Sequence, residues 1–147
     1  MAKNIIVSNR LPLQITKLDN SFEFIPTSGG LATGMNSVHK DQESLWIGWP
    51  GINDEQIDKK SWGSLKKSLK KEGFFPVSLN NKEIENFYFG LSNKALWPLF
   101  HYFIEFSLFN EEQWNSYYEV NKKFADSVLQ NIGKGDTVWI HDYQLLL

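Results

Sequence analysis

The sequence contains no cysteine, which excludes disulfide bonds and zinc sites with cysteine ligands. Its three histidines, His39, His101 and His141, lack the i, i+4 spacing of a metal-binding helix. We therefore expect no metal and no bound cofactor. A long apolar run near the N-terminus is also missing, since Ile5–Val7 is too short for a signal peptide core or a membrane span. These absences favour a cytoplasmic protein.

Neither sign of charge is in large excess. The net charge of −2 gives no reason to expect a nucleic acid or an anionic membrane as partner, so any anion site must be local. The length of 147 residues corresponds to about one domain. An aromatic content of 15% supplies enough apolar surface to offset the entropy lost on ordering the chain. The sequence therefore predicts a globular protein of about one domain.

Short apolar runs alternate with amphipathic stretches along the chain. Buried strands are predicted over 4–8, 45–49, 74–79 and 137–140, with a hairpin over 13–16 and 22–25. Helices are predicted over 31–38, 61–72, 81–87 and 111–132. The last of these is expected to begin after Asn110 as N-cap and to end at Gly133. Strands that alternate with helices predict an α/β fold with a mainly parallel sheet and flanking helices.

Polar residues follow the predicted strands at the carboxyl edge, where ligands of open α/β sheets bind. Arg10 comes after the first strand and offers a planar set of donors to a phosphate, with a structural ion pair as the alternative. Gly29-Gly30 precedes the first helix; the pair either lets a diphosphate approach free amides or simply makes a turn. Asp142 follows the last strand and could accept hydrogen bonds from sugar hydroxyls, while His141 is a base or, more readily, a structural residue.

Two aromatic residues, Tyr88 and Trp97, lie on either side of Ser92-Asn93. Phenol and indole groups can donate hydrogen bonds to a phosphate, and their rings can stack on a sugar. Aromatic clusters are also typical of hydrophobic cores, and the spacing alone favours that interpretation.

Five segments of the chain carry a resemblance to a known family. They are residues 6–10 (Ile-Val-Ser-Asn-Arg), 28–34, 45–49, 92–102 and 138–146. In this order they resemble the N-terminal region of the trehalose-6-phosphate synthase family, and they span nearly the whole chain. The resemblance implies a GT-B architecture, in which two Rossmann-like domains face each other across a cleft. The implied reaction transfers glucose from UDP-glucose to glucose 6-phosphate with retention of anomeric configuration.

The resemblance also implies roles for individual residues. By matching position, Arg10, Tyr88 and Trp97 are similar to the family's residues that bind the phosphate of the acceptor. Asp142 resembles the carboxylate that holds the acceptor hydroxyls, and Gly30 resembles the glycine whose amide meets the diphosphate of the donor. Trp49 lies in a family motif, but we assign it no role.

Other parts of the family pattern lie beyond Leu147, namely a histidine block and the donor-binding domain. The resemblance therefore implies that residues 1–147 are a truncated N-terminal acceptor-binding domain that contains no catalytic residue and is inactive alone. One side of its sheet is expected to lie uncovered, which favours homo-oligomers or aggregation. The alternatives are a non-catalytic sugar-phosphate-binding regulatory subunit of a trehalose synthase complex and a nicotinamide-binding module. The missing G-x-G-x-x-G motif argues against the second alternative.

Overall fold

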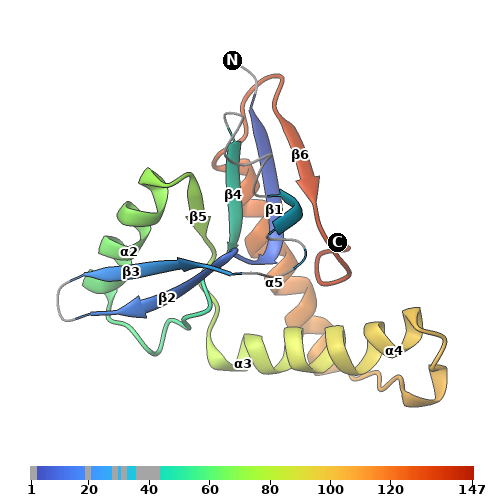
Figure 1. The fold of residues 1–147 in the computed structure, drawn as a ribbon. Helices are drawn as coiled ribbons and strands as arrows, with labels where there is room; N and C mark the ends of the chain where they lie inside the picture. Colours follow the sequence, from blue (N-terminus) through green and yellow to red (C-terminus); the bar gives the residue numbers. More distant parts are fainter. Residues whose placement is uncertain (1–2, 19–20, 28–29, 31–32, 36–43) are drawn as a thin grey trace.

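The computed structural model describes residues 3–18, 21–27, 30, 33–35 and 44–147. Its main sheet has four parallel strands in the order β5-β4-β1-β6 (Figure 1). The strands are β1 (Asn4–Arg10), β4 (Ser44–Trp49), β5 (Phe74–Pro76) and β6 (Thr137–Ile140). The predicted α/β fold with a mainly parallel sheet is confirmed. β5 is shorter than predicted, although the amide of Val77 still donates to the carbonyl of Gly48 over 2.9 Å.

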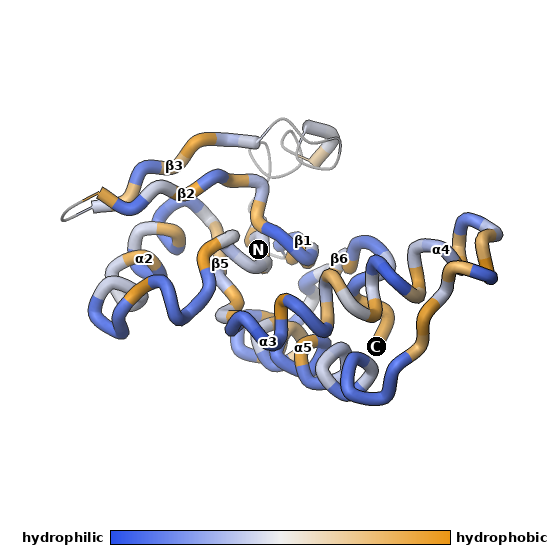
Figure 2. The backbone as a smooth tube through the Cα atoms, turned by 90° about the horizontal axis from the view of Figure 1, so that it is seen from below, coloured by the Kyte–Doolittle hydropathy of each residue, from blue (hydrophilic) through white to orange (hydrophobic). Residues whose placement is uncertain are grey.

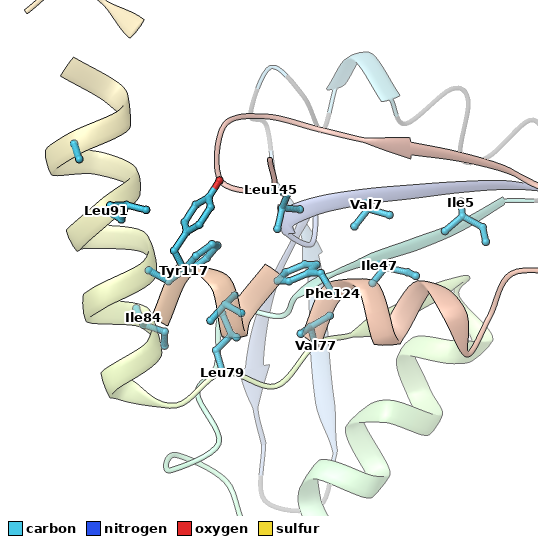
Figure 3. Packing of buried hydrophobic residues seen from close by; sticks show 13 residues of the cluster. Ile5, Val7, Ile47, Val77, Leu79, Ile84, Leu91, Tyr117, Phe124 and Leu145 are labelled. Atoms are coloured by element: carbon cyan, nitrogen blue, oxygen red, sulfur yellow. The ribbon is translucent and has the colours of Figure 1, made fainter. Parts of the chain in front are cut away.

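Both faces of the sheet are covered over β1 and β4, because successive side chains of each strand point to opposite faces and both sets are buried. At the outer strand β6, Trp139 and Ile140 are about half exposed, so the side that was expected to lie uncovered is found there. Ile5 and Val7 of β1 belong to the hydrophobic cluster that α5 (Glu111–Leu129) covers (Figure 3). Ile6 lies between them in the chain and belongs to the opposite cluster, which α2 (Lys59–Lys71) covers. The continuous apolar run of the first strand is therefore explained by burial on two sides.

The predicted hairpin is present and packs on the α2 side. β2 (Leu13–Lys17) and β3 (Phe22–Pro26) pair antiparallel, and Leu13 is buried in the same cluster as α2. Asp58 caps α2 by accepting the amides of Lys60 and Ser61, each at 2.9 Å. The hydrogen bonds from Ser61 are the main cause that lowers the pKa of Asp58 to about 2. This helix ends before Gly73, whose φ of +80° suits a glycine.

The helix predicted over 31–38 lies mostly outside the described residues. Residues 33–35 are helical, and Met35 is buried in the cluster on the α2 side, facing inward as predicted. The other two residues expected to face inward, Leu31 and Val38, belong to the part that the structure does not describe.

A longer helical segment than predicted follows β5. It consists of α3 (Asn81–Glu83), the π-helix η1 (Ile84–Leu96) and α4 (Trp97–Phe100). The sequence predicted a helix over 81–87 only, and that prediction was wrong in length. Figure 1 shows the segment as one long element that extends away from the sheet.

Packing against α5 explains why this helix continues through residues with low helix propensity. Ser92 is fully buried, and Gly90 lies so close to α5 that an added Cβ would be 2.7 Å from the side chain of Gln113. Figure 3 shows Ile84 and Leu91 on the side of the segment that faces Tyr117 of α5. The buried contact outweighs the intrinsic cost of glycine and serine within a helix.

The long helix near the C-terminus, α5, begins where the sequence predicts and ends earlier. The side chain of Asn110 accepts the amide of Gln113 over 3.1 Å, as expected of the N-cap. The helix ends at Leu129, and the Asn131 side chain donates to the carbonyl of Ser127 over 2.7 Å, which satisfies one helix-end acceptor. Gly133 was wrongly predicted to end the helix. Its amide instead donates to the carboxylate of Asp136, the residue that precedes β6, over 2.8 Å.

Candidate functional site

A cavity lies at the carboxyl edge of the sheet, where β1 and β6 end side by side. The two strands pair in parallel, with Val7 opposite Ile140, and the amide of His141 extends the pairing to the carbonyl of Val7 at 2.8 Å. Residues that follow these strands therefore meet at the same place. The cavity has a volume of about 280 Å³, and its lining includes four of the five predicted site residues, Arg10, Gly30, Tyr88 and Asp142.

Arg10 contributes the positive charge of the cavity, and it is the only arginine in the sequence. Its side chain is exposed, and its guanidinium carbon lies 5.5 Å from the ring centroid of Trp49. Its backbone is fixed, because the hydroxyl of Ser8 donates to the Arg10 carbonyl over 2.8 Å and accepts from the indole of Trp46 at the same distance. No ion pair found among the described residues includes Arg10. The alternative role of Arg10, a structural ion pair, therefore gains no support from these residues.

Gly30 lines the same cavity. It is exposed, and an added Cβ would have no atom of the described residues within 4 Å. Open space at this position is compatible with the predicted close approach of a ligand. A clash between a side chain and the described protein atoms is not the reason that glycine stands here. Its neighbour Gly29 lies outside the described residues.

Asp142 is held in an unusual backbone conformation two residues after β6. Its φ of +76° is in the left-handed region, which aspartate tolerates better than most residues. Its carboxylate accepts the amide of Tyr143 over 2.9 Å, and its carbonyl accepts the amide of Leu145 over 3.2 Å. Positive φ at a non-glycine residue is often found at functional sites, and here it accompanies an exposed carboxylate at the cavity.

Trp97, the fifth predicted site residue, does not line the cavity and lies beside it. Its ring is 3.8 Å from that of His101 and 5.4 Å from that of Tyr143, measured between centroids. The hydroxyl of Tyr143 donates to Asn93 over 3.1 Å. Burial raises the pKa of Tyr143, and the nearby Asp142 and Tyr88 add to this shift. Tyr143 lies in the chain between two residues of the cavity lining, Asp142 and Gln144, so its ring contact places Trp97 beside the cavity.

His141 follows β6 directly and packs against that strand. Its ring stacks on that of Trp139 at 4.9 Å, and its Nε2 atom is buried with no hydrogen-bond partner among the described residues. Burial lowers its pKa, and the negative charge of Asp142 opposes this effect. Burial therefore favours the neutral imidazole, which is the form that both predicted roles require.

Some cavity residues were not predicted from the sequence. Thr27 and Gln144 line the cavity, and Gln144 is a buried polar residue. The sequence signal that could have identified Gln144 is its position two residues after Asp142, close to the end of the last strand. Asn9 was noted only as the neighbour of Arg10, yet its Oδ1 atom is buried and has no hydrogen-bond partner in the described part of the chain. A buried acceptor in such a position requires a partner, which a ligand hydroxyl could supply.

Metal and membrane sites are not found in the part of the chain that the structure describes. No cluster of three or more histidine, aspartate or glutamate side chains in it is placed to hold a metal ion. None of its helices combines the length and the apolar character needed to span a membrane.

Comparisons with known proteins agree with this fold and identify the family. The sequence matches the model of glycosyltransferase family 20 over residues 2–147. The alpha,alpha-trehalose-phosphate synthase (UDP-forming) of Botryotinia fuckeliana is 41% identical over 145 residues, which are 97% of this chain and 27% of that protein. The chain thus spans little more than a quarter of the length of this relative.

Solved structures show the same fold at lower identity. A structure from E. coli, bound with UDP-2-fluoro glucose, has a TM-score of 0.73 at 28% identity, covering 99% of this chain and 28% of the other. An alpha,alpha-trehalose-phosphate synthase (UDP-forming) from Burkholderia xenovorans, in complex with glucose-6-phosphate, has a TM-score of 0.69 at 26% identity. That match covers 98% of this chain and 29% of the other. Because the family match extends over residues 2–147, the chain belongs to glycosyltransferase family 20.

Proposed function

We propose that residues 1–147 form the acceptor-binding part of a UDP-forming α,α-trehalose-phosphate synthase. In the proposed reaction the anomeric carbon of glucose leaves the diphosphate oxygen of UDP-glucose and bonds to the anomeric oxygen of glucose 6-phosphate. The products are UDP and trehalose 6-phosphate, and the acceptor hydroxyl loses its proton. The observation that carries this proposal is the cavity at the carboxyl edge of the sheet. It brings together the guanidinium of Arg10 and the carboxylate of Asp142.

Each side chain has a role that fits its chemistry. Arg10 would bind the phosphate of glucose 6-phosphate, because a guanidinium offers two parallel donors to phosphate oxygens. Asp142 would accept hydrogen bonds from the sugar hydroxyls, and Tyr88 would donate its phenol hydroxyl to the phosphate. Gly30 would allow the diphosphate of the donor to approach the backbone. Trp97 would contact the acceptor phosphate from the side of Tyr143, since it lies beside the cavity rather than in its lining.

The charges of the cavity support the proposal that this part is inactive alone. Among the described residues that line the cavity, Arg10 is the only cation and Asp142 is the only carboxylate. One guanidinium cannot neutralise both the acceptor phosphate and the charge that develops on UDP as it leaves. We therefore propose that the groups that stabilise the leaving diphosphate, and the catalytic residues, belong to a donor-binding domain outside residues 1–147. The cytoplasmic location expected from the sequence remains part of this proposal.

The test is an assay of trehalose 6-phosphate formation from UDP-glucose and glucose 6-phosphate. The full-length protein that contains residues 1–147 is expected to form the product, and the 147-residue chain is not. Product formation by the 147-residue chain at a comparable rate would contradict the proposal of an incomplete site. A full-length protein that binds glucose 6-phosphate, but forms no product, would instead favour the non-catalytic regulatory subunit.

A further inference from the structure

The guanidinium of Arg10 lies between an aromatic ring and a glycine of the turn that follows β4. Its Cζ atom is 5.5 Å from the ring centroid of Trp49, the last residue of that strand. A Cβ atom added to Gly51 would be 2.5 Å from the Nη2 atom of Arg10 and 3.0 Å from its Cζ and Nε atoms. The guanidinium therefore occupies the space that the side chain of any other residue at position 51 would need.

The turn that carries Gly51 is fixed relative to Arg10. The indole of Trp49 donates to the carbonyl of Ile52 over 3.1 Å, which closes the turn. The amide of Leu11 donates to the carbonyl of Trp49 over 2.8 Å, which ties the residue after β1 to the end of β4. Arg10 and the surface against which it packs are thus parts of one hydrogen-bonded unit at the edge of the cavity.

Gly51 meets two separate requirements. Its φ of +82° is in the left-handed region, where an L residue with a side chain is strained, and this requirement concerns stability. The missing Cβ concerns the position of Arg10. Since the clashing atoms are the far end of a flexible side chain, an added methyl group would displace the guanidinium rather than disrupt the fold. The second requirement therefore affects ligand binding and not stability.

We propose that Gly51 is a positioning residue for Arg10, because its missing side chain lets the guanidinium lie on the turn, over Trp49, and reach the cavity. The proposal rests on the proposed function, in which the target of Arg10 is the phosphate of the acceptor sugar. An arginine that is already held in its binding arrangement loses less conformational freedom when the phosphate binds. A guanidinium that a side chain at position 51 displaces is no longer held in this arrangement, which weakens the affinity for the acceptor.

The test uses the full-length protein and measures kcat, the KM for each substrate and the unfolding midpoint. Gly51→Ala is expected to raise the KM for glucose 6-phosphate roughly three- to tenfold and to leave the KM for UDP-glucose unchanged. Gly73→Ala is the matched control, because Gly73 has almost the same φ, +80°. It precedes β5 and therefore lies at the amino edge of the sheet, whereas the cavity lies at the carboxyl edge. This control is expected to lower the unfolding midpoint without changing either KM. Should Gly51→Ala fail to fold, Gly51→Asn repeats the test, since asparagine tolerates positive φ.

A double-mutant comparison separates this proposal from the proposed function. In an Arg10→Ala background, Gly51→Ala is expected to cause no further rise in the KM for glucose 6-phosphate. If the two effects multiply, or if Gly51→Ala leaves this KM unchanged while Arg10→Ala raises it, the positioning role of Gly51 is overturned and the role of Arg10 stands. An unchanged KM in Arg10→Ala itself would overturn the assignment of Arg10 to the acceptor phosphate, and the positioning role with it.

Discussion

The hydroxyl of Tyr117 on α5 donates a hydrogen bond of 2.7 Å to the backbone carbonyl of Tyr143. The same oxygen accepts the amide of Leu146 at 3.1 Å, so one buried side chain holds both ends of the segment that follows Asp142. Figure 3 shows the Tyr117 hydroxyl reaching this segment close to Leu145. The conformation of the cavity wall therefore depends on a residue of the helical layer.

Tyr117→Phe is expected to lower the free energy of unfolding by about 1–2 kcal/mol, because it leaves a partly buried carbonyl and amide without their partner while keeping the aromatic ring. Chemical denaturation of the purified chain measures this change. Tyr118→Phe is the control, since that side chain is 53% exposed, and it should change the stability by less than about 0.5 kcal/mol. Equal effects of the two substitutions would contradict a specific role of the Tyr117 hydroxyl.

Arg10→Ala in the full-length protein is expected to weaken the binding of glucose 6-phosphate by about 1.5–3 kcal/mol, the value of a charge-assisted hydrogen bond. The comparison that tests this expectation is glucose, which lacks the phosphate and should be affected much less as an acceptor. Steady-state kinetics with both acceptors provides the measurement. Equal losses for the two acceptors would show that Arg10 has a structural role.

Gly48 and Gly63 offer a matched pair of glycine substitutions with opposite expected outcomes. A Cβ on Gly48 of β4 would be 2.8 Å from the backbone nitrogen of Leu11, so Gly48→Ala forces the strands apart and should cost about 1–3 kcal/mol. Gly63 lies within α2 with no atom within 4 Å of its added Cβ. Gly63→Ala should therefore raise the stability by about 0.5–1 kcal/mol. Thermal or chemical unfolding of the two variants decides whether these contacts are correctly described.

The lowered pKa of His141 predicts a dependence of stability on pH. Burial favours the neutral imidazole in the folded state, so below the ordinary value of 6.5 the unfolded chain binds a proton more readily than the folded one. The free energy of unfolding should therefore fall as the pH decreases from 6.5 towards the lowered folded value. Denaturation curves between about pH 7.5 and pH 5.5 measure this slope. The slope should become smaller in His141→Gln, and an unchanged slope would mean that His141 does not cause it.

The strands were predictable because each is a short apolar run rich in β-branched or aromatic residues, and burial on both faces reinforces that pattern. The length of the helical segment that ends at Phe100 was not predictable from local propensity. Gly90 and Ser92 weaken a helix locally, and the contact of Gly90 with α5 and the burial of Ser92 become apparent only when the helices are packed together.

The candidate site shows the same division between local and long-range information. Arg10 and Asp142 could be found because polar residues that follow parallel strands lie at one edge of the sheet. The relation between Gly51 and Arg10 could not be predicted, since the sequence does not show that the guanidinium of Arg10 packs on this glycine. The position of Trp97 beside the cavity depends on how the long helical segment is placed, which the sequence did not predict.

The segment from Phe100 to Phe109 leads to a prediction about association. Its side chains are apolar and exposed at Phe100, Tyr102, Phe103, Ile104, Phe106, Leu108 and Phe109. Figure 2 shows apolar residues along this part of the tube, at the end of the molecule that carries α4. Trp139 and Ile140 add exposed apolar surface on the outer strand β6. Exposed apolar surface of this kind favours association, because burial releases water from it.

The purified 147-residue chain is therefore expected to self-associate, with an average mass that rises with concentration in sedimentation or light-scattering measurements. Phe103→Ser combined with Phe106→Ser should reduce the association, since both rings are more than half exposed and pack only 6.2 Å apart, measured between centroids. Leu18→Ser is the control, because Leu18 is also exposed, at 49%, but follows β2 in the hairpin on the other side of the sheet. This control should leave the association unchanged. A chain that stays monomeric at all concentrations would contradict the prediction, and an equal reduction by the Leu18 substitution would show that general surface hydrophobicity, rather than this segment, causes the association.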